Sequence, residues 1–436
     1  MKNRTRPTLQ QRLAGRKYHI PSRFIHTLYR VIMSGFVARK YNPHYEIVDK
    51  VSDCKGPCFI IWNHLSRLDH GFVMEAAWPR RINILAGYNE FFRSHLALVF
   101  RLENIIPKKI GVDDFNSIRA MNSIIKKGGC IAFAPEGMSS IYGQNQPIIA
   151  GTGRFLQFYH IPVYYVNLKG SYLTSTKVCL DERYGRVEVK CSLMFTPEQL
   201  ESMSAQEIDD RINEAFRHDD YAWSRENHIK WKNSGNMCEK LEEICYKCPR
   251  CGAELSMKGE GNTIKCSKCG NGATVDDYYE FHPFDADCVI PESPTKWVEF
   301  ERKAVIDQIR RDPSFCFRFR TKMGCLPKYR LVKSKKITSV VCGGGEMWID
   351  HEGVHFRGLR DGEPYIFDLD YTQVFSIPVV TDTSYFSLYV NKEFHDFFPE
   401  EPIVGKLLVI AEEMHRLHVN YSKNFPWYDW MYEETK

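Results

Sequence analysis

The chain has 436 residues, of which 43% are hydrophobic, and its formal net charge is +5. This length accommodates two or three domains, and the hydrophobic fraction is ordinary for domains that bury a core. No stretch approaches the roughly 18 to 20 apolar residues of a membrane-spanning helix, so we expect no such helix. No secretory signal peptide is visible, so we do not expect one either.

The first 40 residues are strongly basic. They contain ten Lys or Arg and no Asp or Glu, whereas the remainder holds 49 basic and 54 acidic residues. Apolar residues recur there at helical spacing (Ile25, Leu28, Ile32, Phe36), which predicts an amphipathic helix over about residues 21–39. Such a segment is typical of interfacial anchors, so we expect residues 1–40 to bind anionic lipid at the cytoplasmic face of a membrane. The alternatives are a helix packed on its own domain and a transit peptide.

Short apolar runs alternate with helix-like stretches between about Tyr45 and Thr196. The runs predict buried strands at 56–63, 82–88, 130–135 and 161–170, and an edge strand at 186–195. The stretches between them predict helices at 89–102 and 116–129 and helices that begin near Leu68 and Gly151. This alternation indicates an α/β domain over residues 41–235, with helices on both faces of a sheet and the chemistry at the strand ends.

The first candidate site is the sequence WNHLSRLDHG at 62–71. Five residues turn an ideal helix through about 500°, so His64 and Asp69 cannot share a helical face. They can meet only if His64 lies in the loop after the strand and Asp69 lies in the first helical turn. A histidine oriented by a carboxylate is the usual arrangement of a general base. The alternative, equally open on this stretch alone, is a helix capped by Asn63 or Ser66 beside an unrelated histidine.

A second motif follows the strand at 130–135, where Glu136 and Gly137 form a turn in FAPEGMSS. In this order and separation, the two motifs resemble those of the glycerolipid acyltransferase family, which includes the 1-acylglycerol-3-phosphate acyltransferases. The family pattern comprises N-H-x-x-x-x-D, a basic block, F-P-E-G-T-R-S and a V-P-containing strand. The counterparts here are Asn63 to Asp69, NIIPKKI at 104–110, FAPEGMSS at 133–140 and IPVYYV at 161–166. The resemblance covers roughly residues 20–230.

The resemblance implies transfer of a fatty acyl group from acyl-CoA or acyl-carrier protein to a lysophospholipid hydroxyl, above all that of 1-acyl-sn-glycerol 3-phosphate, in phospholipid biosynthesis. His64 would be the base and Asp69 would orient it. Lys109, with Lys108 close by, would hold the acceptor phosphate. The further residues implied at the substrate site are Asn63, Ser66, Glu136 and Gly137.

This sequence departs from the family pattern at three places. Met138-Ser139 replaces Thr-Arg, Glu103 stands where the family usually has Gly, and Lys109 replaces Arg. One arginine expected near the phosphate is therefore missing, and we expect Arg154 to supply some of that charge. A catalytically weak or inactive membrane scaffold that recruits partners is the alternative function.

The chain contains fifteen cysteines, and their spacing indicates thiols and metal ligands in a reducing compartment rather than disulfides. Two C-x-x-C-G knuckles, Cys248/Cys251 and Cys266/Cys269, predict a ribbon over residues 244–275 that holds a structural zinc ion. Cys245 offers a competing pair with Cys248. The segment lacks a basic and aromatic pattern, so we expect no nucleic-acid partner.

Residues 296–436 are strand-rich. EMWIDHEGVHFRG predicts two strands around a tight turn, and PIVGKLLVIAEEMHRLHVNY predicts a closing helix. Strands capped by a terminal helix loosely resemble a pleckstrin-homology-like or GRAM-like α+β domain. The basic segment 328–336 would either meet lipid head groups or form a solvated loop.

Overall fold

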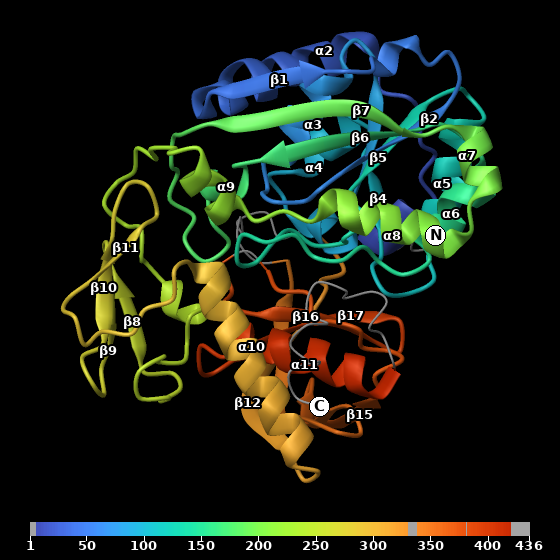
Figure 1. Cartoon of the computed structure of the whole chain (residues 1–436). Coiled ribbons are helices and arrows are strands. Elements are labelled where there is room, and N and C mark those ends of the chain that lie inside the picture. The colour runs from blue at the N-terminus through green and yellow to red at the C-terminus, as the bar shows by residue number, and fades with distance from the viewer. Residues whose placement is uncertain (1–5, 330–337, 381, 420–436) are drawn as a thin grey trace.

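A computed structural model describes residues 6–329, 338–380 and 382–419. It has a mixed α/β architecture, as the sequence predicted, and its strands form three sheets (Figure 1). Most of the basic segment 328–336, five residues of the basic N-terminal segment and the last 17 residues of the chain lie outside the described residues. None of the described helices is both long and apolar enough to cross a membrane.

The largest sheet has seven strands in the order β1-β7-β6-β2-β5-β3-β4. All neighbours in it are parallel except β6 and β7. The strands are β1 (Pro43–Ile47), β2 (Cys58–Trp62), β3 (Ile82–Gly87), β4 (Ile106–Lys108), β5 (Cys130–Phe133), β6 (Val163–Lys169) and β7 (Val187–Phe195). The expectation that 186–195 forms an edge strand is wrong, because β1 pairs along its outer side.

Helices cover both faces of this sheet, which confirms the predicted layering. Alternate side chains of β2 enter two different cores, because successive side chains of a strand point to opposite faces. Cys58, Ile60 and Trp62 pack with α3 (Asp69–Ala77). Phe59 and Ile61 pack in the other core, which contains side chains of α5 (Phe115–Ile125), α6 (Thr152–Tyr159) and α8 (Ala205–Phe216).

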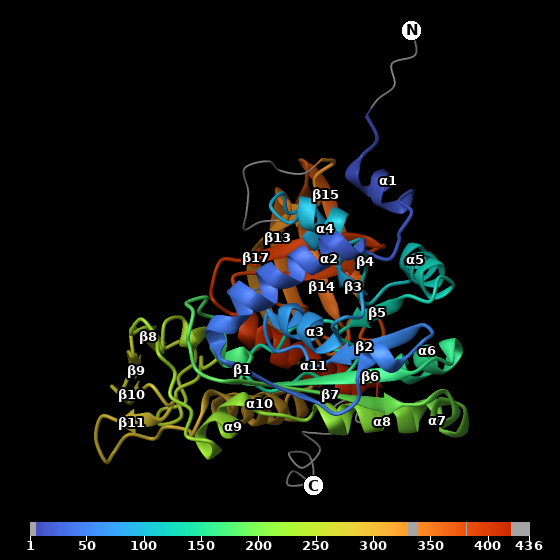
Figure 2. The same ribbon diagram turned by 90° about the horizontal axis from the view of Figure 1, so that it is seen from above.

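The N-terminal helix differs from the single α-helix expected over 21–39. It consists of α2 (Arg23–Arg30), a π-helix (Val31–Ala38) and a short 3-10 turn (Arg39–Tyr41). It packs on the outer side of α3, so it is the outermost layer on that face (Figure 2). Its inward side is partly polar, with His26, Ser34 and Ala38 buried. The apolar side chains exposed to solvent are Phe24, Leu28, Val31, Ile32 and Phe36.

The helix expected over 89–102 is interrupted. A 3-10 turn (Tyr88–Phe92) is followed by an extended residue, Arg93, and then by the short helix α4 (Ala97–Leu102). Phe91 and Phe92 are adjacent in the chain and both are buried. The remaining helices of this region are α1 (Leu9–Ala14), α7 (Pro197–Ser202) and α9 (Asp220–Glu226).

The cysteine-rich segment forms a four-stranded antiparallel sheet in the order β11-β10-β9-β8. Its strands are β8 (Met257–Glu260), β9 (Thr263–Cys266), β10 (Gly272–Val275) and β11 (Phe281–Pro283). The sheet thus extends past the expected boundary at residue 275, because β11 pairs with β10.

The C-terminal region folds as a six-stranded antiparallel sheet in the order β15-β14-β13-β12-β17-β16. Its elements are α10 (Pro294–Arg311), β12 (Cys316–Cys325), β13 (Val340–Asp350), β14 (Val354–Arg360), β15 (Glu363–Leu369), β16 (Phe386–Val390), β17 (Glu393–Pro399) and α11 (Val404–Val419). The two strands expected around residues 351–353 are present as β13 and β14. The likeness to a pleckstrin-homology domain stays a prediction.

One cysteine pair departs from the expectation of free thiols. Cys325 and Cys342 form a disulfide between β12 and β13. Cys342 lies at a register irregularity, where Gly343 pairs with Met323 and Val341 pairs with Gly324. This extra residue lets the side chain of Cys342 reach Cys325 on the neighbouring strand.

Candidate active site

His64 and Asp69 meet, and they do so in the one arrangement that the sequence allowed. His64 lies in the loop after β2, and Asp69 is the first residue of α3. His64 Nδ1 lies 2.8 Å from Asp69 Oδ2. The aspartate is buried, whereas 28% of the histidine side chain is exposed. The other ring nitrogen, Nε2, makes no hydrogen bond with the described residues, so it is free to face a substrate.

The carboxylate of Asp69 accepts five hydrogen bonds. Oδ2 accepts from His64 Nδ1 and from the backbone N–H groups of Leu65 (2.7 Å) and Ser66 (2.9 Å). Oδ1 accepts from the hydroxyls of Ser66 (3.0 Å) and Ser171 (2.6 Å). The two backbone N–H groups can only donate, so Oδ2 acts as an acceptor. The Nδ1 proton of His64 therefore points at Asp69 and leaves a lone pair on Nε2.

Ser171 belongs to the loop after β6 and was not identified from the sequence. Asp220, on α9, holds this loop by accepting the backbone N–H groups of Gly170 (2.7 Å) and Tyr172 (2.8 Å). His218 Nε2 lies 2.7 Å from the same carboxylate. The only sequence signal for Ser171 is its position directly after a buried strand, at the same sheet edge as His64.

Glu136 positions the loop of the base rather than facing open solvent. Its Oε2 accepts the backbone N–H of His64 (2.7 Å), and its Oε1 accepts from Asn145 (2.8 Å). Burial raises the pKa of Glu136 well above its ordinary value, and these two donors oppose the shift. Gly137 has φ +77°, and a Cβ there would lie 2.7 Å from Ile149, so the turn requires glycine.

Asn63 and Ser66 are both engaged in holding the site together. The Asn63 side chain donates to the carbonyl of Leu168 (2.8 Å) and accepts from its N–H (2.7 Å), which ties the end of β2 to β6. Ser66 bonds Asp69 and also contacts the Ser171 hydroxyl (2.9 Å). The polar side-chain atoms of Asn63 and Ser66 are therefore bonded to other residues of the protein.

The cations of the basic block lie at the same edge of the sheet but at a distance from His64. Lys108 ends β4, which is three strands away from β2, or roughly 14 Å at the usual strand spacing. Burial lowers the pKa of Lys108. The Lys109 ammonium lies 5.1 Å from the ring centre of Tyr88. Arg154 is exposed on α6, and no contact among the described residues joins it to His64.

Glu103, where the family usually has Gly, has a separate structural role. Its carboxylate lies 2.8 Å from Nδ1 of His26, and both side chains are buried. This pair fastens α2 to the end of α4. The presence of Glu103 in place of the family's glycine therefore affects how the N-terminal helix is attached, and not the site around His64.

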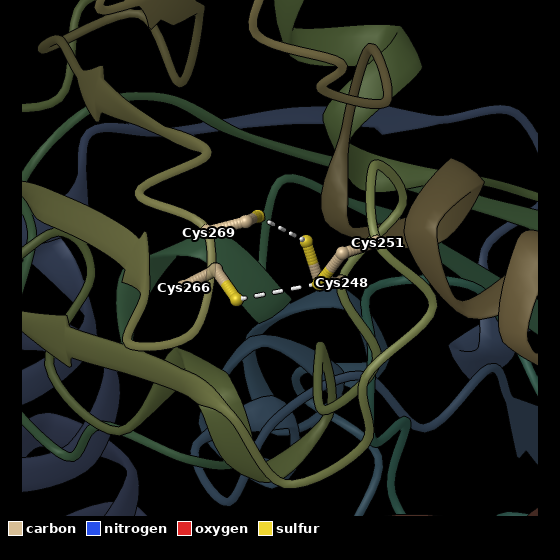
Figure 3. A group of neighbouring side chains, drawn as sticks. All are labelled: Cys248, Cys251, Cys266 and Cys269. Carbon is tan, nitrogen blue, oxygen red and sulfur yellow. Dashed lines mark hydrogen bonds between the residues drawn. The ribbon is translucent and has the colours of Figure 1, made fainter.

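Four cysteines form the candidate metal centre (Figure 3). Their Sγ atoms all lie within 4.8 Å of one another, with Cys248 to Cys269 at 3.6 Å and Cys251 to Cys266 at 3.8 Å. A tetrahedral zinc site with Zn–S bonds of about 2.3 Å requires sulfur separations of about 3.8 Å, so the arrangement fits such an ion. Cys245, the competing candidate, is buried and is not part of this group.

No protein-family model matches the chain, and no curated protein matches it. Among solved structures, it is similar to a crystal structure of a 1-acyl-sn-glycerophosphate (LPA) acyltransferase, PlsC, from Thermotoga maritima. The two share 16% sequence identity with a TM-score of 0.34, over 44% of this chain and 78% of the other. The function must therefore be inferred from the site itself.

Proposed function

We propose that this protein is an acyltransferase that moves a fatty acyl group from the thioester of acyl-CoA or acyl-carrier protein to the hydroxyl of a lysophospholipid, with 1-acyl-sn-glycerol 3-phosphate as the leading acceptor. The observation that carries the proposal is the His64–Asp69 pair. Nδ1 of His64 is bonded to a carboxylate that accepts five hydrogen bonds in all, and Nε2 makes no hydrogen bond with the described residues. The motif order supports the same reaction class.

The geometry supports a direct transfer without an acyl-enzyme. His64 Nε2 accepts the proton of the acceptor hydroxyl while its oxygen attacks the thioester carbonyl carbon. The new C–O bond forms, the C–S bond breaks, and the imidazolium returns the proton to the departing thiolate. Asp69 stabilises the imidazolium, and because its other partners are already in place, no rearrangement is needed during the reaction.

The remaining candidate residues divide into two groups under this proposal. Asn63, Ser66, Glu136 and Gly137 shape the site by positioning the loop of the base. Lys108 and Lys109 supply positive charge at the carboxyl edge of the sheet, where lysine acts as a point charge toward phosphate. Arg154 would add to this charge from α6.

We also propose that the protein lies on a membrane surface, at its cytoplasmic face. The support is the basic composition of residues 1–40 together with the exposed apolar side of the N-terminal helix. A lipid acceptor would then be taken from the membrane to which this helix binds.

In the ribbon, Cys248, Cys251, Cys266 and Cys269 would hold a structural zinc ion. Four thiolates complete a closed tetrahedral shell, which leaves no open position for catalysis. Such an ion would stabilise a segment too small to bury much of a core of its own.

The test is an acyl-transfer assay on the full chain with a panel of lysolipids and both donor types. We expect His64→Ala to lower kcat/KM by at least about 100-fold, because a positioned general base contributes about 100- to 10,000-fold. Asp69→Asn should also lower it, since it replaces the acceptor of the Nδ1 hydrogen bond with an amide. The matched control is His44→Ala, an exposed histidine on β1. Equal activity of His64→Ala and wild type would refute the mechanism.

A further inference from the structure

Lys177 is a buried cation next to the turn that departs from the family pattern. It follows β6, and only 8% of its surface is exposed. Its ammonium donates to the hydroxyl of Ser139 at 2.8 Å. Ser139 occupies the position where the family pattern has arginine, so this structure supplies from another loop a positive charge that the turn itself lacks.

This turn is bonded directly to the loop of the base. The backbone N–H of Ser140 donates to the carbonyl of His64 at 2.8 Å. The loop that carries Lys177 also carries Ser171, which bonds Asp69. Lys177 therefore belongs to the same set of loops, at the carboxyl edge of the sheet, that holds His64 and Asp69.

The charge of Lys177 is not neutralised by a carboxylate at close range. Burial lowers its pKa to about 8, and the negative charge that acts on it most is Glu90. Glu90 is already paired with Arg93, at 2.7 Å. Within the described part of the chain, no carboxylate lies at ion-pair distance from Lys177. A buried ammonium whose bonded partner is a neutral hydroxyl, with no carboxylate beside it, is costly, so a bound anion would be strongly favoured at this position.

The C-terminal domain supports the backbone at Lys177. The N–H of Asp382 donates to the carbonyl of Lys177 at 2.8 Å. Phe375 and Ser376, from the same domain, line a small cavity of about 10 Å³ together with Met138 and Glu136. The C-terminal domain thus packs against the turn and the loop that bring Lys177 and Ser139 together.

We propose that Lys177 binds the anionic head group of the acceptor, which makes it the residue that selects lysolipids with a phosphate over neutral ones. The inference rests on the proposed function and specifies the substrate class of the same site. Ser139 positions the ammonium, and the C-terminal domain holds the loop at the required place.

The experiment measures binding and turnover separately. Titration calorimetry on the full chain compares the soluble ligand 1-hexanoyl-glycerol 3-phosphate with its neutral counterpart 1-hexanoylglycerol. We expect Lys177→Met to weaken the Kd of the phosphate ligand by about tenfold or more, because a hydrogen bond to a charged group is lost, and to leave that of the neutral ligand unchanged. Lys177→Arg should retain most of the affinity. The control is Lys190→Met, an exposed lysine on β7.

Each outcome decides a different claim. An unchanged Kd of the phosphate ligand in folded Lys177→Met overturns the role of Lys177, even if acyl transfer depends on His64. Lysine-dependent binding without acyl transfer sustains the anion site and overturns the proposed function. Absence of binding to wild type overturns the anion site directly. If Lys177→Met unfolds, Lys177→Gln, which keeps a hydrogen-bonding side chain without the charge, gives the same comparison.

Discussion

The hydrogen bonds around Asp69 determine what His64 can do. A carboxylate that bonded His64 alone could rotate and leave the ring free to turn. Here Oδ1 is held by two hydroxyls while Oδ2 is held by two backbone N–H groups and the imidazole. The ring is thereby fixed in one tautomer with Nε2 outward, which is the state a base needs before the reaction starts.

Ser171→Ala tests whether this fixation matters for the chemistry. The variant removes the shortest of the five hydrogen bonds to Asp69 (2.6 Å). We expect kcat to fall by about tenfold, with the KM of the acceptor little changed, because Ser171 acts through Asp69 and not through the substrate. Steady-state kinetics with the best lysolipid of the panel measures both constants.

Rescue by a conservative variant distinguishes this positioning role from a general loss of stability. Ser171→Thr keeps the hydroxyl and should retain more activity than Ser171→Ala. If the two variants lose activity equally while their melting temperatures match that of wild type, the hydroxyl does not position Asp69.

The site residues that could be predicted from the sequence are those that lie within short motifs. His64 and Asp69 are five positions apart, and Glu136 lies in a turn directly after a buried strand. Ser171 and Lys177 could not be found in this way, because the loop after β6 has no periodic pattern, and Asp220 lies outside these motifs, on α9. Their contacts also join distant parts of the chain: 102 positions separate Ser171 from Asp69. Such contacts follow from the sheet order, which the sequence did not reveal.

Among the elements of the seven-stranded sheet, the strands with long apolar runs were predicted, whereas the exposed β1 and the three-residue β4 were not. β2 is a continuous run of buried apolar residues, which is typical of a central parallel strand. β1 has four exposed residues of five, with no hydrophobic run to mark it. The π-helix over Val31–Ala38 was also missed, because the apolar spacing indicates a helix without specifying its hydrogen-bond pattern.

The clearest prediction about a single part of the fold concerns zinc binding by the cysteine-rich ribbon. Its two knuckles end in glycines with left-handed backbone, Gly252 (φ +71°) and Gly270 (φ +77°), which let each chain segment turn back beneath its cysteine pair. We expect about one zinc ion per purified chain by elemental analysis. Removal of the ion by a strong chelator should lower the melting temperature, because binding free energy is part of the folding free energy of such a segment.

Cys248→Ser provides the matched variant, and Cys288→Ser, a cysteine outside the four-cysteine group, is the control. The first should lose the zinc and the second should keep it. A chain without zinc that melts at the same temperature with and without chelator would contradict the metal assignment.

At the scale of the whole molecule, the three sheets are not independent. One hydrophobic cluster contains buried side chains of the seven-stranded sheet, the ribbon and the C-terminal sheet. Arg302 on α10 is buried between Glu412 and Glu413 of α11, at 2.7 and 2.5 Å. The sequence indicated three segments by composition, but their mutual packing depends on contacts such as Thr295 to the carbonyl of Tyr142 (3.3 Å), 153 positions apart. This packing brings the C-terminal region against the loops of the site, where Phe375 and Ser376 lie beside Glu136.

The exposed apolar side of the N-terminal helix packs against no other part of the described structure. Phe24 and Phe36 are 75% and 74% exposed, although they belong to a helix whose opposite side is buried. Deleting residues 1–40 would be a poor test of membrane binding, because it would also remove the buried pair of His26 with Glu103. Point substitutions on the exposed side avoid this loss.

The last prediction concerns the double variant Phe24→Ser/Phe36→Ser in sedimentation with vesicles of phosphatidylcholine and phosphatidylglycerol. We expect the partition constant to fall by at least about 100-fold, because insertion of each of the two phenylalanines contributes about 1.5–3 kcal/mol. Phe158→Ser is the control, since Phe158 is 76% exposed on α6. Added salt should weaken the binding of all three proteins, because the basic residues act through screened charge. If Phe158→Ser reduces sedimentation as much as the double variant does, the N-terminal helix is not the specific anchor.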